Sequence, residues 1–164
     1  MKDLLRAVNV FAAASVIRSP GVAVRLFPAA VLTGPEERMM LVMLGEDGHF
    51  LAREWIAAGT GWALVYNAGI IARRLAETGA AWFLLIHNHP GGNPALSETD
   101  ATGVRHVLLR PPPLLFHFLD FLAVAPAATP DSPPQFSSFR FGPAGEGLGF
   151  VRAPFYSAEA DIGA

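Results

Sequence analysis

The sequence predicts an α/β protein of the mixed α+β kind, in which helices pack on the faces of a mixed β-sheet. Short apolar runs of strand length alternate with segments of helical periodicity, and a turn at Glu46–Gly48 joins two of the runs into a hairpin. The resulting order of helix, hairpin, helix, strand, helix and strand is typical of a sheet covered by helices. A chain of 164 residues is most simply one domain and can bury a core.

The N-terminal part of the chain is expected to hold a helix, a short strand and the hairpin. Apolar residues recur at helical spacing across residues 2–18, and Ser19-Pro20-Gly21 is a helix stop signal. Residues 22–26 have the composition of a short strand. The apolar run at 38–44 and the segment at 49–57 are the hairpin strands, because the Asp-Gly pair between them tolerates a positive φ.

Two helices and two strands follow. A helix is expected over 64–78, where one face is apolar and the other charged, and Gly79 suits its C-terminal end. The run at 80–86 (AAWFLLI) contains no polar residue and predicts a fully buried strand. A second helix is predicted over 97–109, before a run of prolines, and another strand over 114–123.

The C-terminal part is expected to be less regular. Residues 125–137 are rich in Pro and Ser and predict a loop, after which 138–141 could pair at an edge of the sheet. We expect one domain over 1–142, with its motif-bearing core at about 34–142, and a loosely packed tail at 143–164.

Charge balance and the absence of cysteine exclude several classes of function. Lys and Arg number 12 against 14 Asp and Glu, a net charge of −2, so no overall basic field attracts nucleic acid. There is no cysteine, which excludes disulfides, thiolate zinc ligands and cysteine nucleophiles. Zinc-deaminase chemistry, which needs a Cys-x-x-Cys pair, is excluded by the same fact.

Composition also bears on location and assembly. Residues 1–20 carry no clear secretory signal and the lack of cysteine suits a reducing compartment, so we expect a cytoplasmic protein. The apolar stretch 114–128 is too short to cross a membrane as a helix. Hydrophobic residues make up 52% of the chain and charged residues 16%. Either an Ala-rich core or an apolar patch that joins a homo-oligomer accounts for this balance.

The most informative segment for function begins at the end of the predicted strand 80–86. His87 and His89 are two residues apart, so both imidazoles can point to one side of a strand. Asp100 follows in the first turn of the next predicted helix. Two imidazoles and a carboxylate suit Zn²⁺, with iron and manganese as alternatives, and three protein ligands leave a position open for water, as in catalytic zinc sites.

Ordinary structural roles compete with this interpretation. Ser97-Glu98-Thr99-Asp100 also fits a helix capping box, and an Asp100 side chain that reaches back to the helix end would not face a metal in the same rotamer. His49 and His106 are expected in solvent and His117 in the core. The full pattern, His-x-His-Pro-x6-Ser-x2-Asp, is more specific than either of its parts and favours the metal site.

This pattern resembles the JAMM (MPN+, JAB) zinc metalloprotease motif, which is an upstream Glu followed by His-x-His-x10-Asp. The segment His87-Asn88-His89-Pro90, with Gly92 after it, is most similar to the bacterial RadC branch of that superfamily. The resemblance covers residues 34–142 and implies a JAB/MPN-type fold with cytidine-deaminase-like layering. The chain departs from the usual RadC pattern in having Gly91 for Ser, Leu96 for Pro and Phe121 for His.

The resemblance implies a role for each residue of the pattern. His87, His89 and Asp100 would hold Zn²⁺, Glu37 would be the general base, and Ser97 would donate a hydrogen bond to the oxyanion. The implied reaction is hydrolysis of peptide or isopeptide bonds in a protein substrate. Glu36 is the alternative base, but the position of Glu37 two residues before the apolar strand favours Glu37.

Two other functions remain open at this point. The RadC branch is associated with DNA repair, so the protein could act on or near nucleic acid, although its charge gives that no support. It could also be a non-catalytic zinc-binding scaffold. The retention of Glu37 beside a complete ligand set argues against a scaffold.

Overall fold

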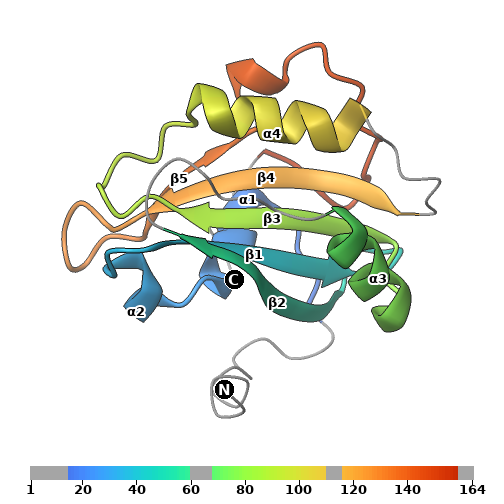
Figure 1. The fold of residues 1–164 in the computed structure, drawn as a ribbon, viewed down its shortest axis with the longest axis horizontal. Helices are drawn as coiled ribbons and strands as arrows, with labels where there is room; N and C mark the ends of the chain where they lie inside the picture. Colours follow the sequence, from blue (N-terminus) through green and yellow to red (C-terminus); the bar gives the residue numbers. More distant parts are fainter. Residues whose placement is uncertain (1–14, 60–67, 110–115, 159–164) are drawn as a thin grey trace.

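A computed structural model describes residues 15–59, 68–109 and 116–158 and contains one five-stranded sheet in the order β2-β1-β3-β4-β5 (Figure 1). Strands β3 and β4 are parallel, and the other neighbouring pairs are antiparallel. The strands are β1 (Glu37–Leu44), β2 (Phe50–Gly59), β3 (Trp82–Asn88), β4 (His117–Ala125) and β5 (Gln135–Ser138). The predicted mixed α+β fold is therefore confirmed.

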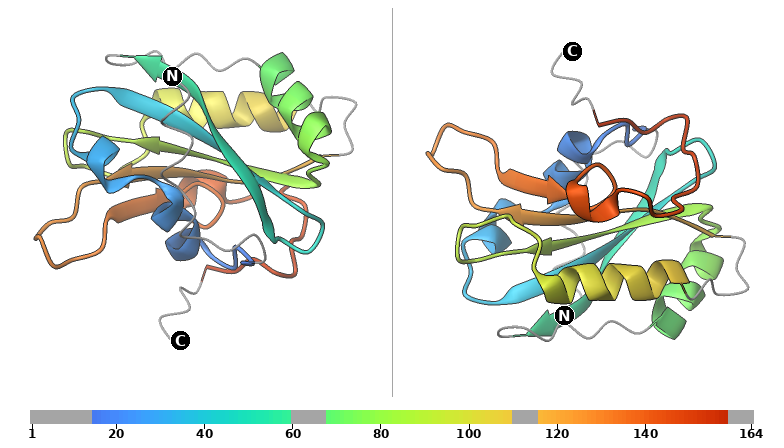
Figure 2. Two further views of the ribbon diagram at one scale, coloured as in Figure 1. Left: turned by 90° about the horizontal axis from the view of Figure 1, so that it is seen from below. Right: turned by 90° about the horizontal axis from the view of Figure 1, so that it is seen from above.

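Helices cover both faces of this sheet (Figure 2). Helices α3 (Ala68–Thr78) and α4 (Glu98–Leu109) lie on one face; α1 (Pro20–Ala23), η1 (Val24–Leu26) and α2 (Ala29–Leu32) lie on the other. A last short helix, η2 (Pro143–Gly145), follows β5. Each face of the sheet has its own hydrophobic core, because successive side chains of a strand point to opposite faces. The three layers agree with a JAB/MPN-type fold.

Strand β3 lies at the centre of the sheet and carries the metal motif at its end. All seven of its residues are buried, because β1 and β4 flank it and helices cover both of its faces. Leu84 and Ile86 pack toward α1 and η1, whereas Phe83 and Leu85 pack toward α3 and α4. The histidines that follow in this alternation therefore emerge on the face that carries α3 and α4.

The turns around these strands agree with the sequence. The β1–β2 hairpin turns at Gly48, which has a φ of 82°. Helix α3 ends at Gly79, with a φ of 67°, as predicted. Helix α4 begins after Ser97, whose hydroxyl accepts a hydrogen bond from the backbone N–H of Asp100 at 3.1 Å.

The prediction for the segment before the hairpin is wrong. Ser19 starts a helix instead of ending one, because its hydroxyl accepts a hydrogen bond from the N–H of Val22 and Pro20 occupies the first turn. Residues 22–26 are therefore helical and not a strand. Of the helix expected over 2–18, residues 15–18 are not helical and Val16 bridges to His49; residues 1–14 lie outside the described part.

The segment expected to be a loosely packed tail is, as far as Ala158, packed on the sheet. Ala153 and Tyr156 are buried in the core on the α1 face, and Leu148 and Phe150 pack against the other core. The apolar residues of this segment recur irregularly, so they carry no helix or strand signal. Whether a domain boundary falls at residue 142 stays a prediction.

The remaining differences are at the ends of elements. The predicted edge strand at 138–141 is β5 at Gln135–Ser138, which pairs with β4. Residues 64–67 of the expected helix, and 114–115 of the expected strand, lie outside the described part. No helix within the described ranges is long and apolar enough to span a bilayer.

Candidate metal centre

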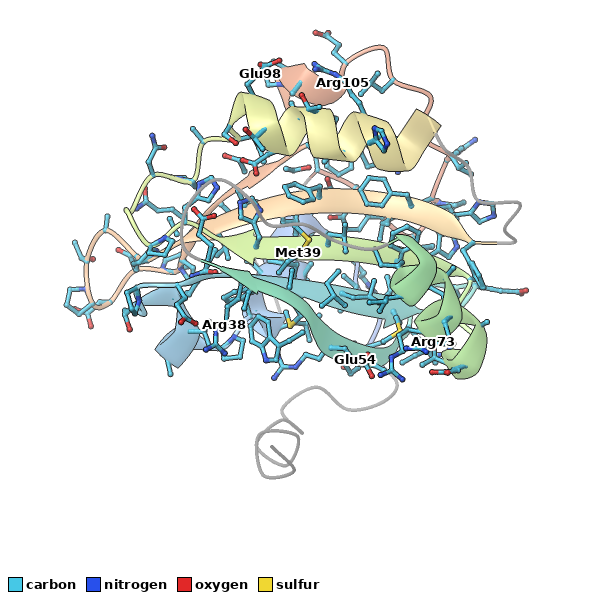
Figure 3. All side chains as sticks on the ribbon, viewed as in Figure 1. Arg38, Met39, Glu54, Arg73, Glu98 and Arg105 are labelled. Carbon is cyan, nitrogen blue, oxygen red and sulfur yellow. The ribbon has the colours of Figure 1, made fainter. Side chains whose placement is uncertain are left out.

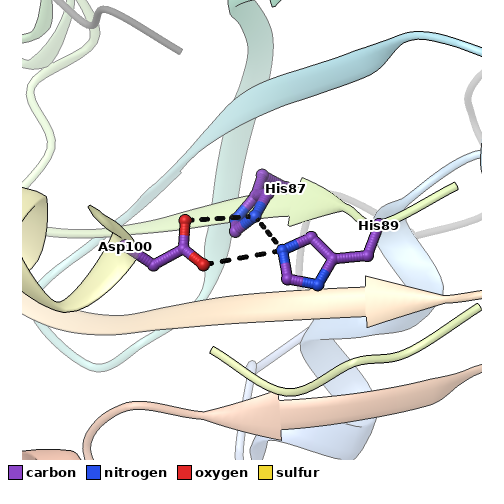
Figure 4. Close-up of side chains that lie close together, drawn as sticks. All are labelled: His87, His89 and Asp100. Atoms are coloured by element: carbon purple, nitrogen blue, oxygen red, sulfur yellow. Dashed lines mark hydrogen bonds and ion pairs between the residues drawn. The ribbon is translucent and has the colours of Figure 1, made fainter. Parts of the chain in front are cut away.

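His87, His89 and Asp100 converge on one point where β3 meets the start of α4 (Figure 4). Their three ligand atoms all lie within 4.8 Å of one another. The Asp100 oxygens lie 3.4 Å from Nε2 of His87 and 3.6 Å from Nε2 of His89, and the two Nε2 atoms are 2.6 Å apart. The three residues were predicted as ligands from their spacing, and the fold brings them together.

Backbone and loop contacts orient the two imidazoles. The His87 ring is enclosed by the core, with only 1% of its side chain exposed. The backbone N–H of His89 donates to Val124 O at 2.7 Å, which holds the chain on β4 beyond the last strand residue. Nδ1 of His89 lies 2.7 Å from Asn93 O, so the Gly-rich loop directs the opposite nitrogen toward His87 and Asp100.

Asp100 takes part in both the helix cap and the ligand cluster. Its Oδ2 accepts hydrogen bonds from the N–H and the hydroxyl of Ser97, each at 2.7 Å, while Oδ1 is the oxygen nearest to His87. The expectation that a capping Asp100 could not also face the candidate metal site is therefore wrong. The two oxygens share the contacts, because Oδ1 lies near His87 while Oδ2 lies near both Ser97 and His89.

The donor set fits a zinc ion. Two ligand atoms of a tetrahedral site with bonds of about 2.0–2.1 Å lie roughly 3.3–3.4 Å apart. Asp100 Oδ1 lies 3.4 Å from His87 and Oδ2 lies 3.6 Å from His89, near this spacing, whereas the two imidazole nitrogens, 2.6 Å apart, would have to separate to hold an ion. Two nitrogens and one carboxylate oxygen are also ligands that Zn²⁺ accepts in catalytic sites.

The ionisation of His87 and Asp100 favours cation binding, whereas the ionisation of His89 opposes it. Burial lowers the pKa of His87 to about 4, so that this imidazole is neutral and able to ligate at neutral pH. Burial alone would raise the pKa of Asp100, but its contacts with His89, His87 and Ser97 outweigh burial and lower it to about 2. The polar contact with Asp100 raises the pKa of His89 above its usual value.

One nitrogen of the cluster lacks a partner. In the described part of the chain, the buried Nδ1 of His87 has no hydrogen-bond partner. The ring of Phe121 lies beside the His87 ring, with centroids 5.0 Å apart. Phe121 stands where the RadC pattern has His, and a phenyl ring cannot accept the N–H of His87 as a nitrogen or oxygen could.

Glu37 and Glu36, the two candidate bases, lie in different surroundings. Met39 pairs with His87 across β1 and β3, and Glu37 is two residues before Met39, so Glu37 lies on the same face of the sheet as the histidines. Burial raises the pKa of Glu37, and the charges of His89 and Asp100 also act on it. Glu36 is turned to solvent and forms an ion pair of 3.2 Å with Arg38.

Ser97, the predicted oxyanion donor, is held by Asp100. Its hydroxyl donates to Asp100 Oδ2 and accepts from the Asp100 N–H, so the hydroxyl proton points at the ligand carboxylate. To donate to an oxyanion, this hydroxyl would have to turn away from Asp100.

The other histidines are outside the cluster. His49 pairs with Asp47 in the hairpin turn, His106 is exposed on α4, and His117 packs against Trp82 at the opposite end of β3. Sequence reasoning missed Asn88, which is fully buried between the two ligand histidines. Its place between the two histidines was the available signal, but the strand was predicted to end at residue 86, before Asn88.

Comparison with known proteins shows the family of this chain. A family model described as the RadC-like JAB domain matches residues 17–128, more than half of the chain. The protein therefore belongs to the RadC-like JAB domain family, as its motif predicted. A UPF0758 protein of Gloeothece citriformis is 28% identical over 106 residues, which are 65% of this chain and 44% of that protein. The chain thus spans less than half the length of this curated relative.

Proposed function

We propose that this protein is a zinc-dependent hydrolase that cleaves peptide or isopeptide bonds. The observation that supports this most strongly is the convergence of His87, His89 and Asp100, with Glu37 on the same face of the sheet. Two neutral donors and one anionic donor leave a bound dication with net positive charge, which is the condition for electrophilic catalysis. The family includes metallohydrolases, and this supports the reaction class but not a substrate.

Zinc and Glu37 have separate roles in the proposed hydrolysis. Zinc, when bound, supplies a Lewis acid that acidifies water to a pKa near 7 and polarises a carbonyl. The Glu37 carboxylate accepts the proton of the attacking water and returns it to the leaving amine. Burial raises its pKa and so brings it closer to neutrality, where a carboxylate can both accept and release a proton.

Ser97 has a conditional role in this proposal. Its hydroxyl would turn from Asp100 Oδ2 to the oxyanion as negative charge develops on the former carbonyl oxygen. The backbone N–H of Ser97 also donates to Asp100 Oδ2, so the ligand carboxylate keeps a hydrogen bond when the hydroxyl leaves.

Metal analysis combined with a substrate panel tests the proposal. The purified protein should contain about one equivalent of zinc and should cleave some members of a panel of peptide and isopeptide-linked substrates. Chelation should stop cleavage, and added zinc should restore it. Stoichiometric zinc binding without cleavage of any member of a broad panel would instead support a non-catalytic, zinc-binding scaffold function.

The substitution Glu37→Gln separates catalysis from metal binding. The amide cannot accept the proton, so we expect hydrolysis to fall by at least about 10²-fold while zinc content stays at one equivalent. Glu36→Gln is the matched control, because Glu36 faces Arg38 and solvent, and it should retain activity. Loss of activity in the control alone would assign the base to Glu36.

No described feature favours nucleic acid as the partner. The one pair of adjacent arginines, Arg73-Arg74 on α3, is neutralised by acidic neighbours: Arg74 contacts Glu54 at 3.0 Å and Glu77 at 2.9 Å. Arg73, which Figure 3 labels on α3, lies 3.9 Å from Glu77. Binding of DNA with a steep salt dependence would overturn this conclusion.

A further inference from the structure

We propose that Asn88 is a positioning residue that fixes Glu37 beside the metal ligands. This inference rests on the proposed function of Glu37, but its structural part can be tested without activity. Asn88 lies between the two ligand histidines, is 0% exposed, and takes no part in the ligand cluster itself. Alternation along the strand directs its side chain to the sheet face opposite the two imidazoles.

The carboxamide of Asn88 binds the backbone on both sides of Glu37. Its Oδ1 accepts a hydrogen bond from the N–H of Arg38 at 2.7 Å. Its Nδ2 donates to Glu36 O at 3.0 Å and to Val31 O at 3.4 Å. The residue before Glu37 and the residue after it are therefore both held by one side chain.

These bonds occur where the strand pairing stops. The ladder between β1 and β3 ends at the pair Met39–His87, so the backbone of β3 does not hold residues 36–38. On its other side Glu37 pairs with Gly59, the last residue of β2. Beyond the end of this ladder, the side chain of Asn88 thus links the start of β1 to β3.

The chemistry of the three bonds requires an amide. Arg38 presents a donor, whereas Glu36 and Val31 present carbonyl acceptors, and only a carboxamide offers one acceptor and two donors in a side chain of this size. Asn88→Ala removes all three bonds. Asn88→Asp keeps the acceptor for Arg38 and the volume, but sets a carboxylate against two carbonyl oxygens.

The matched control is Asp120→Asn on the neighbouring strand β4. Asp120 is also 0% exposed, and it accepts from the Ser138 and Tyr156 hydroxyls and from the N–H groups of Phe121 and Arg140. An amide can keep these bonds, because both hydroxyls are also able to accept. This substitution therefore interchanges an acid and an amide at another buried site, one that does not contact residues 36–38 through these hydrogen bonds.

Amide hydrogen exchange measured by NMR tests the positional part. In Asn88→Ala we expect the Arg38 amide to exchange at least about tenfold faster, relative to the Leu41 amide in the middle of β1, and zinc to remain at one equivalent. Asp120→Asn should leave the Arg38 amide protected. An Arg38 amide that stays protected in Asn88→Ala, or a loss of zinc from that variant, would overturn the proposal.

Steady-state kinetics test the catalytic part. A misplaced Glu37 should lower kcat by about 10²-fold with little change in KM, because substrate binding does not depend on the base. Unchanged kcat, or an effect confined to KM, would overturn the proposal.

If Asn88→Ala does not fold, Asn88→Asp is measured with the same kcat, KM and zinc criteria. If the wild-type protein cleaves nothing, the proposed function fails, and the exchange and zinc results alone decide whether Asn88 holds this segment.

Discussion

At the scale of single residues, Asp100 links helix formation to the candidate metal centre. The same carboxylate satisfies donors at the start of α4 and lies 3.4–3.6 Å from Nε2 of His87 and of His89. Its negative charge is also favourable at a helix N-terminus. Folding of α4 and assembly of the ligand set therefore depend on the same side chain, and Ser97 controls the orientation of that side chain.

The substitution Ser97→Ala should weaken both the helix and metal binding. Loss of the hydroxyl removes the helix cap, at a cost of about 1 kcal/mol in the free energy of unfolding. It also removes one donor to Asp100 Oδ2, for which we expect a 10- to 100-fold loss of zinc affinity. Chelator competition and urea unfolding measure the two effects. Thr99→Ala, at an exposed position in the same turn, is the control; equal zinc affinity in both variants would contradict this expectation.

At the scale of elements, the β1–β2 turn combines a local and a long-range requirement. Gly48 adopts a φ of 82°, which side-chain-bearing residues rarely adopt. A Cβ atom at this position would also lie 2.2 Å from the ring of Phe155, from a segment far away in the sequence. The hairpin therefore turns correctly and receives the C-terminal segment only with glycine at this position.

We expect Gly48→Ala to lower the free energy of unfolding by about 2 kcal/mol or more, because backbone strain adds to the displacement of Phe155. Urea unfolding measures the change. Gly149→Ala is the control, since a Cβ there meets no atom within 4 Å and its φ is not positive. A Gly48→Ala protein as stable as this control would show that the turn and Phe155 can adjust freely.

At the scale of the whole molecule, Asp120 connects the sheet with the chain after β5. It joins β4 to Ser138, Arg140 and Tyr156 through hydrogen bonds of 2.7–2.9 Å. The Arg140 guanidinium in turn donates to Leu119 O and Val151 O. This buried carboxylate therefore ties Arg140 and Tyr156, which lie beyond the β4–β5 pairing, to the sheet.

Asp120 should make stability depend on pH. Burial is the main cause that raises its pKa from 3.8 to about 6, although the four hydrogen bonds act against it. The folded protein keeps this proton up to about pH 6, whereas the unfolded chain releases it near pH 4. The stabilisation is therefore complete below about pH 4 and is lost as the pH rises through 6, a change of up to about 3 kcal/mol.

Unfolding of the wild type and of Asp120→Asn by urea, in the presence of a chelator, isolates this contribution. The free energy of unfolding of the wild type should fall relative to that of the variant between pH 4 and pH 6, and the difference should be constant above about pH 7. Parallel pH profiles for the two proteins would show that Asp120 titrates normally.

Local signals in the sequence were sufficient for most of the core elements and for the three residues that converge at the candidate metal centre. The apolar run before His87, the Asp-Gly turn and the glycine after α3 determine their elements through short-range sterics and burial. The spacing of His87, His89 and Asp100 is itself local, since a strand, a loop and one helical turn contain all three. For this reason the family and its metal motif could be predicted from the sequence alone.

Only the tertiary structure decided how distant segments meet. It placed Glu37 on the face of the histidines, bound Asn88 to the backbone around Glu37, and packed residues 143–158 on the sheet. It also showed that Asp100 reaches Ser97 and the histidines together. These arrangements depend on hydrogen bonds and packing between residues far apart in the chain, and such contacts leave no periodic pattern in a single sequence.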